Sequence, residues 1–162
     1  MNYAKILKAD IANGTGFRVT LFVTGCGRNC KGCFNKIAQD PNYGKPFDDT
    51  AKKKIFEELD KDWCDGLSLL GGEPMSKLSD NRKVVLELAK EVKEKYPNKN
   101  IWMWSGYTKE ELENIPEGRE ILKYIDVLVD GPFVEELKDI SLKWKGSSNQ
   151  HVIYLDHNNC NK

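Results

Sequence analysis

Long hydrophobic runs are absent from this sequence. The longest apolar stretches reach four residues, as in Ile101 to Trp104, whereas a helix that spans a bilayer needs about 20. The opening residues, MNYAKILKAD, also lack the apolar core of a secretion signal. We therefore expect no membrane partner, and the cytoplasm is the expected location.

An excess of charge of either sign is also absent. Lysine plus arginine and aspartate plus glutamate number 25 each, so the charge balance gives no reason to expect DNA, RNA or an anionic membrane as a partner. Apolar residues make up 40% of the 162 residues, which fits one soluble globular domain with one core. We predict a single domain over residues 1–162 that binds no nucleic acid.

Cysteine is scarce outside one short segment. Three of the five cysteines lie in Cys26-Gly-Arg-Asn-Cys30-Lys-Gly-Cys33, a C-x3-C-x2-C arrangement. In a chain without a secretion signal, such crowding indicates metal or redox chemistry rather than disulfides. Thiolates are the ligands of iron–sulfur clusters, and three of them leave one iron of a [4Fe–4S] cluster with an open position. An open position is typical of a catalytic metal site.

Zinc is the competing interpretation of these three cysteines. A tetrahedral zinc ion needs a fourth ligand, which His151, His157 or Cys160 could supply. Structural zinc sites usually pair two C-x2-C knuckles, and no second knuckle accompanies this one. The spacing favours the cluster and leaves a zinc-stabilised, non-catalytic binding module as the alternative from a different class.

Strand and helix patterns alternate along the chain. The predicted strands cover 17–24, 66–70, 100–105, 126–129 and 151–155; the predicted helices cover 50–61, capped by Asp49 or Thr50, and 79–96, with a third opened by the capping-box pair Thr108 and Glu111. This order predicts an α/β fold with a parallel sheet and right-handed crossovers. Because a closed eight-stranded barrel needs at least about 200 residues, we expect a partial, open (β/α) barrel with about five to six parallel strands.

Polar or glycine-rich loops follow the first four predicted strands. They are the cysteine loop, Gly71-Gly72-Glu73-Pro74, Ser105-Gly106-Tyr107 and Asp130-Gly131-Pro132. Parallel sheets place active sites at the C-terminal edge, where such loops meet. Two glycines permit unusual backbone angles and close approach of another group, so Gly71, Gly72 and Glu73 are candidate cofactor contacts. Ser105 and Asp130 are further candidate cofactor contacts, with turn formation and capping as their alternative roles.

The cysteine loop, followed about forty residues later by Gly-Gly-Glu-Pro, resembles the radical S-adenosylmethionine superfamily. Over nearly the whole chain, the sequence looks like the activating proteins of anaerobic ribonucleoside-triphosphate reductases. The segments that carry this closer resemblance are 10–18, 26–36, 66–74, 102–107, 127–133 and 142–150.

The resemblance implies that Cys26, Cys30 and Cys33 hold a [4Fe–4S] cluster whose open iron binds the amino and carboxylate groups of S-adenosylmethionine. A one-electron donor such as flavodoxin reduces the cluster, and the S–C5′ bond of the cofactor breaks to methionine and a 5′-deoxyadenosyl radical. This radical takes a hydrogen from a glycine near the C-terminus of the partner reductase and leaves a glycyl radical there. A radical activase of another glycyl-radical enzyme is the alternative.

The sequence departs from the superfamily just before the third cysteine. Many members carry an aromatic residue there that stacks on adenine, whereas this chain has Gly32, with Phe34 directly after Cys33. We therefore expect the backbone from Gly32 to Phe34 and the sheet edge to provide the adenine contact. Asn35 is a candidate cofactor contact or a residue that orders the loop. Segment 144–150 is expected over the barrel mouth or, by preference, on the partner-binding surface.

Overall fold

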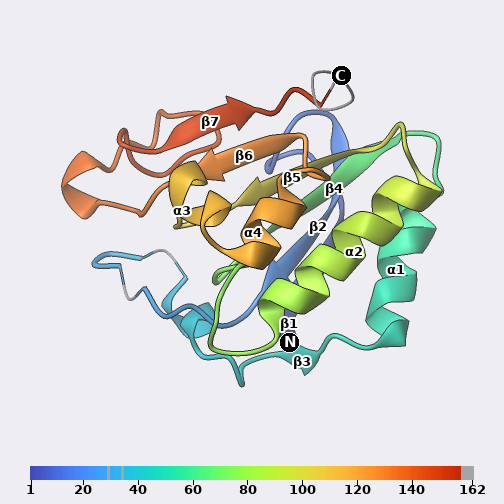
Figure 1. Ribbon diagram of the computed structural model, residues 1–162, viewed down its shortest axis with the longest axis horizontal. Helices are drawn as coiled ribbons and strands as arrows, with labels where there is room; N and C mark the ends of the chain where they lie inside the picture. The colour runs from blue at the N-terminus through green and yellow to red at the C-terminus, as the bar shows by residue number, and fades with distance from the viewer. Residues whose placement is uncertain (29, 34, 158–162) are drawn as a thin grey trace.

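The computed structural model describes residues 1–28, 30–33 and 35–157, so the expectations on Phe34 and Cys160 lie outside the described residues. One mixed sheet of seven strands runs through the described chain in the order β3-β1-β2-β4-β5-β6-β7 (Figure 1). The strands are β1 (Asn2–Asp10), β2 (Phe17–Val23), β3 (Lys45–Pro46), β4 (Cys64–Gly71), β5 (Asn100–Trp104), β6 (Val127–Asp130) and β7 (His151–Tyr154).

The middle of the sheet is parallel, as the alternating order predicts. Among the described residues, four neighbouring strands, β2, β4, β5 and β6, run in the same direction. The expectation of about five to six parallel strands is wrong, because β7 pairs antiparallel with β6. A parallel neighbour requires a crossover back to the starting edge of the sheet. Segment 131–150 contains only the short helix η2 (Glu135–Leu137), so the chain turns back directly.

Two edge strands on the other side were not predicted. β1 is joined to β2 by the short segment 11–16 and therefore pairs antiparallel with it, and β3 adds antiparallel to β1. The register of β1 shifts between Tyr3 and Lys5 and again between Leu7 and Asp10. Such irregularities insert extra residues and break the period-two pattern of a strand, so the sequence pattern did not reveal β1.

The predicted helices are present, with small changes at their ends. They are α1 (Asp49–Leu59), α2 (Asn81–Lys95) and α3 (Lys109–Glu113). Helix α4 (Pro116–Ile121) and the short helix η1 (Lys36–Gln39) after the cysteine loop were not predicted. The capping prediction for α3 is confirmed, since the hydroxyl of Thr108 accepts a bond from the amide of Glu111 at 3.2 Å. Asp48, rather than Asp49 or Thr50, caps α1. No helix in the described part of the chain is long and apolar enough to cross a bilayer.

A large apolar core lies on one face of the sheet and a smaller apolar cluster on the other. Helices α1, α2 and α4 lie on one face (Figure 1), and buried residues of the central strands, such as Leu21 and Leu69, pack with them in the main core. Because side chains alternate along a strand, their neighbours point the other way. A second, smaller cluster on that face contains Trp102, Val127 and Val129.

A buried polar network fixes the segment before β2. The guanidinium of Arg18 donates to the hydroxyl of Ser68 at 2.6 Å and to the carbonyl oxygens of Thr15 and Leu67, and burial lowers its pKa to about 10. Burial alone would raise the pKa of Asp10. Bonds from Thr20, Asn13 and the Ala12 amide outweigh it and hold that pKa below the ordinary value. These contacts lie at the opposite end of β2 from the cysteine loop.

Candidate functional site

The loops that follow the parallel strands meet around one cavity of about 230 Å³. All three motif cysteines line it, together with side chains or backbone from the loops after β4, β5 and β6. Of the predicted site residues, the structure brings Cys26, Cys30, Cys33, Asn35, Gly71, Gly72, Glu73 and Ser105 to this cavity. The shared edge predicted from the strand order is thus where these residues gather.

Backbone contacts hold the two ends of the cysteine loop. The amide of Cys26 donates to the carbonyl oxygen of Gln39 at 3.0 Å, and the amide of Cys33 donates to that of Cys30 at 3.1 Å. Burial raises the pKa of the Cys26 thiol. Within the described residues, no three Cys, His, Asp or Glu side chains are grouped closely enough to hold a single metal ion. The thiols share a cavity without forming a closed mononuclear site.

The two glycines after β4 allow close backbone packing against the end of β2. Gly71 has a φ of +120°, and a Cβ there would lie 2.4 Å from the carbonyl oxygen of Val23. The amide of Gly72 donates to that same oxygen at 2.8 Å, and a Cβ on Gly72 would lie 2.6 Å from the carbonyl oxygen of Ala38. The close approach seen here is therefore between chain segments, which fixes this loop beside the cysteine loop.

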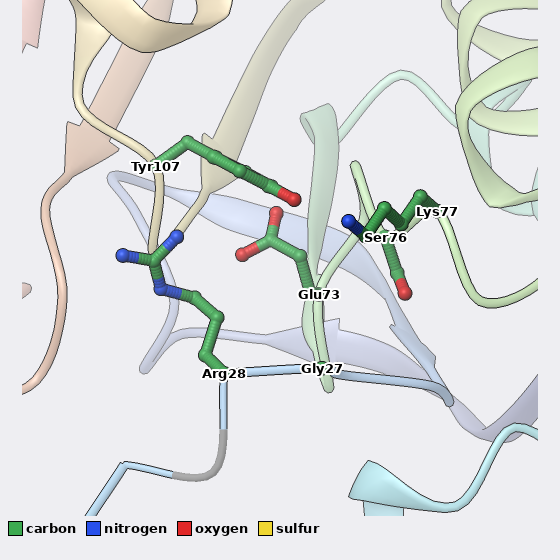
Figure 2. Close-up of a pocket in the computed structure, with 6 residues that line it drawn as sticks. All are labelled: Gly27, Arg28, Glu73, Ser76, Lys77 and Tyr107. Carbon is green, nitrogen blue, oxygen red and sulfur yellow. The ribbon is translucent and has the colours of Figure 1, made fainter.

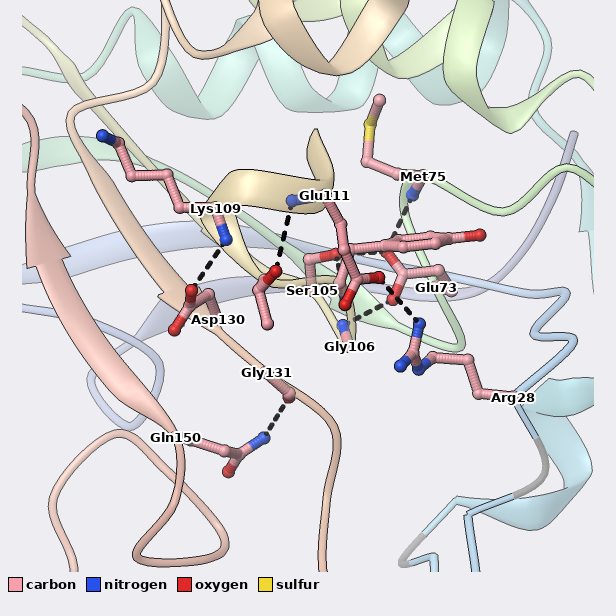
Figure 3. A network of polar contacts seen from close by, with 12 residues as sticks. Arg28, Glu73, Met75, Ser105, Gly106, Lys109, Glu111, Asp130, Gly131 and Gln150 are labelled. Carbon is pink, nitrogen blue, oxygen red and sulfur yellow. Dashed lines mark hydrogen bonds and ion pairs between the residues drawn. The ribbon is translucent and has the colours of Figure 1, made fainter. Parts of the chain in front are cut away.

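Glu73 links this loop to the loop after β5. The residue is 2% exposed, and its carboxylate accepts bonds from the amides of Met75 and Gly106, at 3.0 and 2.6 Å, and from the hydroxyl of Ser105 at 2.8 Å (Figure 3). Burial raises the pKa of Glu73, and these bonds oppose the rise. With three donors from the chain on its two oxygens, Glu73 holds the Ser105–Gly106 turn in place.

Asp130 and Gly32 are placed differently from the other candidates. The Asp130 carboxylate accepts a bond from the amide of Lys109, at the start of α3, at 2.8 Å and lies 3.2 Å from Nδ1 of His151. The described lining after β6 includes Gly131 and Phe133 but not Asp130. Gly32 has a φ of +74°, and a Cβ there would lie 2.8 Å from the side chain of Glu135. Both remain predictions as cofactor contacts.

Several lining residues were missed by sequence reasoning. Trp104 lines the cavity, and its indole nitrogen donates to the carbonyl oxygen of Trp144 at 2.6 Å. Segment 144–150, expected over the barrel mouth or on the partner-binding surface, reaches the cavity through Gly146 and Gln150. The side-chain amide of Gln150 donates to the carbonyl oxygen of Gly131 at 2.9 Å (Figure 3). Arg28 also lines the cavity. Its position between Cys26 and Cys30 was the sequence signal that could have identified it as a lining residue.

Comparison with known proteins decides the family. Residues 12–153 match the model of the 4Fe-4S single cluster domain. The anaerobic ribonucleoside-triphosphate reductase-activating protein of Pasteurella multocida is 45% identical over 157 residues, covering 95% of this chain and 97% of the relative. The chain belongs to this family of activating proteins. The Escherichia coli K12 protein of that name is 41% identical (96% and 99% covered) and that of phage T4 is 39% identical (94% and 93%).

The residues at the cavity fit an iron–sulfur cluster better than zinc. The matched family model describes a 4Fe-4S domain, and three thiols of the described loop line one cavity. Of the proposed fourth zinc ligands, His151 contacts Asp130, and Nε2 of His157 lies 2.5 Å from the carbonyl oxygen of Ile125. Membership in this family of activating proteins supports an enzymatic role with the anaerobic reductase as partner.

Proposed function

We propose that this chain is an activating enzyme that cleaves S-adenosylmethionine reductively and generates a glycyl radical on anaerobic ribonucleoside-triphosphate reductase. The observation that carries the proposal is one cavity lined by Cys26, Cys30 and Cys33 and by the loops after β4 and β5. When bound by these thiolates, a [4Fe–4S] cluster supplies one electron, and the S–C5′ bond of the cofactor breaks to methionine and a 5′-deoxyadenosyl radical.

The reaction requires positioning rather than an acid or base from the chain. Bound S-adenosylmethionine would itself supply the abstraction of one hydrogen atom from the Cα of the partner's glycine, so no side chain of this protein has to take that hydrogen. The chain's task is to orient the cofactor and to exclude water and oxygen. Gly71 and Gly72 fix the loop beside the cysteines, and Glu73 holds Ser105 and Gly106 at the same cavity.

The partner's glycine loop enters, in this proposal, from an open side of a partial barrel formed by the sheet. The order of strands supports an open side, since β3 and β7 are edge strands at opposite ends of the sheet. We further propose one domain over residues 1–162, a one-electron donor of the flavodoxin type, and the cytoplasm as the compartment. The reason for the last is the crowding of free thiols in the cysteine loop, which suits a reducing environment.

The test is an anaerobic assay of cofactor cleavage and radical transfer. The protein is reconstituted with iron and sulfide, reduced with dithionite and given S-adenosylmethionine, and 5′-deoxyadenosine and the electron paramagnetic resonance spectrum are recorded. We expect deoxyadenosine and a reduced-cluster signal that the cofactor perturbs. Cys30→Ala should abolish both, because it removes one of three ligands; full turnover in this variant would contradict the ligand assignment.

A second stage names the target of the radical. The activated protein is mixed with the anaerobic reductase, and the glycyl radical signal of the reductase is measured. Cleavage of the cofactor without a radical on the reductase would favour an activase of another glycyl-radical enzyme. A colourless protein with tightly bound zinc and no cleavage would reject the enzymatic proposal altogether.

A further inference from the structure

Arg28 lies in the cysteine loop, but its side chain contacts the loop after β5. Its guanidinium carbon lies 4.9 Å from the ring centre of Tyr107. A Cβ on Gly106 would lie 2.4 Å from Cδ of Arg28, so the glycine leaves the space that this side chain occupies. Figure 2 shows Arg28 and Tyr107 extending toward the same space as the carboxylate of Glu73. Arg28 thus connects the cysteine loop to the Ser105–Gly106 turn.

The guanidinium of Arg28 has few acceptors among the residues that the structure describes. Its Nε is buried and has no hydrogen-bond partner there. Its ion pair with Glu111 is long, 3.9 Å, and the Glu111 side chain is 49% exposed (Figure 3). Glu73, a buried carboxylate that lines the same two cavities as Arg28, already accepts three bonds from the chain. A buried N–H without an acceptor is costly, so this position is suited to an external acceptor.

Two cavities meet at Arg28. One is the cavity of about 230 Å³ that the three cysteines line, and the other, of about 290 Å³, is lined by Gly27, Arg28, Glu73, Ser76, Lys77 and Tyr107 (Figure 2). Arg28 and Glu73 belong to both. A guanidinium matches a carboxylate because its parallel N–H groups can bind both oxygens. A carboxylate is therefore one acceptor that can complete this site.

We propose that Arg28 binds the carboxylate of the methionine part of S-adenosylmethionine and makes the site selective for that group. The inference rests on the proposed function, which places this part of the cofactor beside the cysteine loop. Nε of Arg28 donates to the carboxylate, while Tyr107 and Gly106 hold the guanidinium in place. Arg28 is a binding residue for the cofactor and not a ligand of the cluster.

The test measures binding rather than turnover. The oxidised, cluster-loaded protein is titrated anaerobically with S-adenosylmethionine and with its decarboxylated analogue, which lacks only the carboxylate. Arg28→Met should raise the Kd for S-adenosylmethionine about 10- to 100-fold, the loss of a charge-assisted hydrogen bond, and change the Kd for the analogue less than about twofold. Lys53→Met is the matched control, because it removes one positive charge from α1, where the side chain is 77% exposed and lines neither cavity, and it should leave both Kd values unchanged.

Bound iron and the visible absorption spectrum are measured on every variant. If Arg28→Met loads too little iron to be titrated, Arg28→Gln takes its place with the same expected result. Equal weakening of both ligands, weakening of neither, or loss of iron in both variants would overturn the role of Arg28. A wild-type protein that holds the cluster but binds no S-adenosylmethionine would instead overturn the proposed function, so the two failures are distinguishable.

Discussion

Replacing Glu73 with glutamine should destabilise the fold, because donors alone surround the carboxylate. The amides of Met75 and Gly106 and the hydroxyl of Ser105 all donate to it, and the side chain is 2% exposed. Glutamine offers one acceptor oxygen, and its own NH₂ group then faces at least one of these donors. A buried donor left without an acceptor costs about 1–3 kcal/mol.

This cost is large enough to measure by thermal unfolding. For a domain of about 150–250 residues, 1 kcal/mol shifts Tm by about 2–4 °C, so Glu73→Gln should lower Tm by about 2–12 °C. Circular dichroism of the cluster-free proteins under reducing conditions provides the readout. Ser105→Ala is the comparison, because it removes one donor to Glu73 and the acceptor of the Tyr107 amide but leaves the amides of Met75 and Gly106 bonded, and it should cost about 1 kcal/mol. An unchanged Tm for Glu73→Gln would refute the reasoning.

The pH dependence of the same pair of proteins gives an independent check. Burial raises the pKa of Glu73 above its ordinary value of 4.5. The folded state therefore binds this proton more tightly than the unfolded state does, and the contribution of Glu73 to stability falls as the pH rises through the raised pKa. Glutamine does not titrate. The advantage of wild type over Glu73→Gln should thus grow as the pH is lowered from neutrality toward about 5, and a constant difference would contradict the raised pKa.

Two further predictions concern the glycine loop and the network before β2. Gly71→Ala should lower the free energy of unfolding in urea by more than about 3 kcal/mol, because the φ is +120° and a Cβ would lie 2.4 Å from the Val23 carbonyl oxygen. Gly27→Ala is the control. A Cβ there would meet nothing nearer than 3.8 Å, so it should cost less than about 0.5 kcal/mol. Asp10→Asn should cost about 1–3 kcal/mol at neutral pH. Because the pKa of Asp10 is lowered from 3.8, this difference should stay constant above about pH 5 and shrink as the pH falls through the lowered pKa; a difference that grows with acid would contradict the assignment.

Local sequence signals predicted the elements that carry the site. The period-two pattern of β2 and the helical spacing of α2 are properties of neighbouring residues, so no distant contact is needed to read them. The same is true of the capping pair Thr108 and Glu111, which the structure confirms. Because parallel strands end at one edge, the strand order also predicted that the cysteine loop and Gly71–Glu73 would meet.

These local signals do not indicate the direction of a strand. An alternating or apolar run looks the same in a parallel and an antiparallel neighbour, so the segment that became β7 gave no sign that it runs back along β6. The direction follows from the connection 131–150, which stays at the C-terminal edge of the sheet. The bulged strand β1 lacked even the alternation that marks a strand.

The sequence alone thus determined which metal ligands the site can offer. The tertiary structure decided which polar side chains already have partners within the described chain. Ligand type and spacing are covalent properties of the cysteine loop, and they indicated the cluster before any fold was known. The partners of a polar side chain depend on residues far away in the chain. Glu73 accepts bonds from Ser105 and Gly106, and Asp130 accepts one from Lys109. The buried Nε of Arg28, in contrast, has no acceptor among the residues that the structure describes.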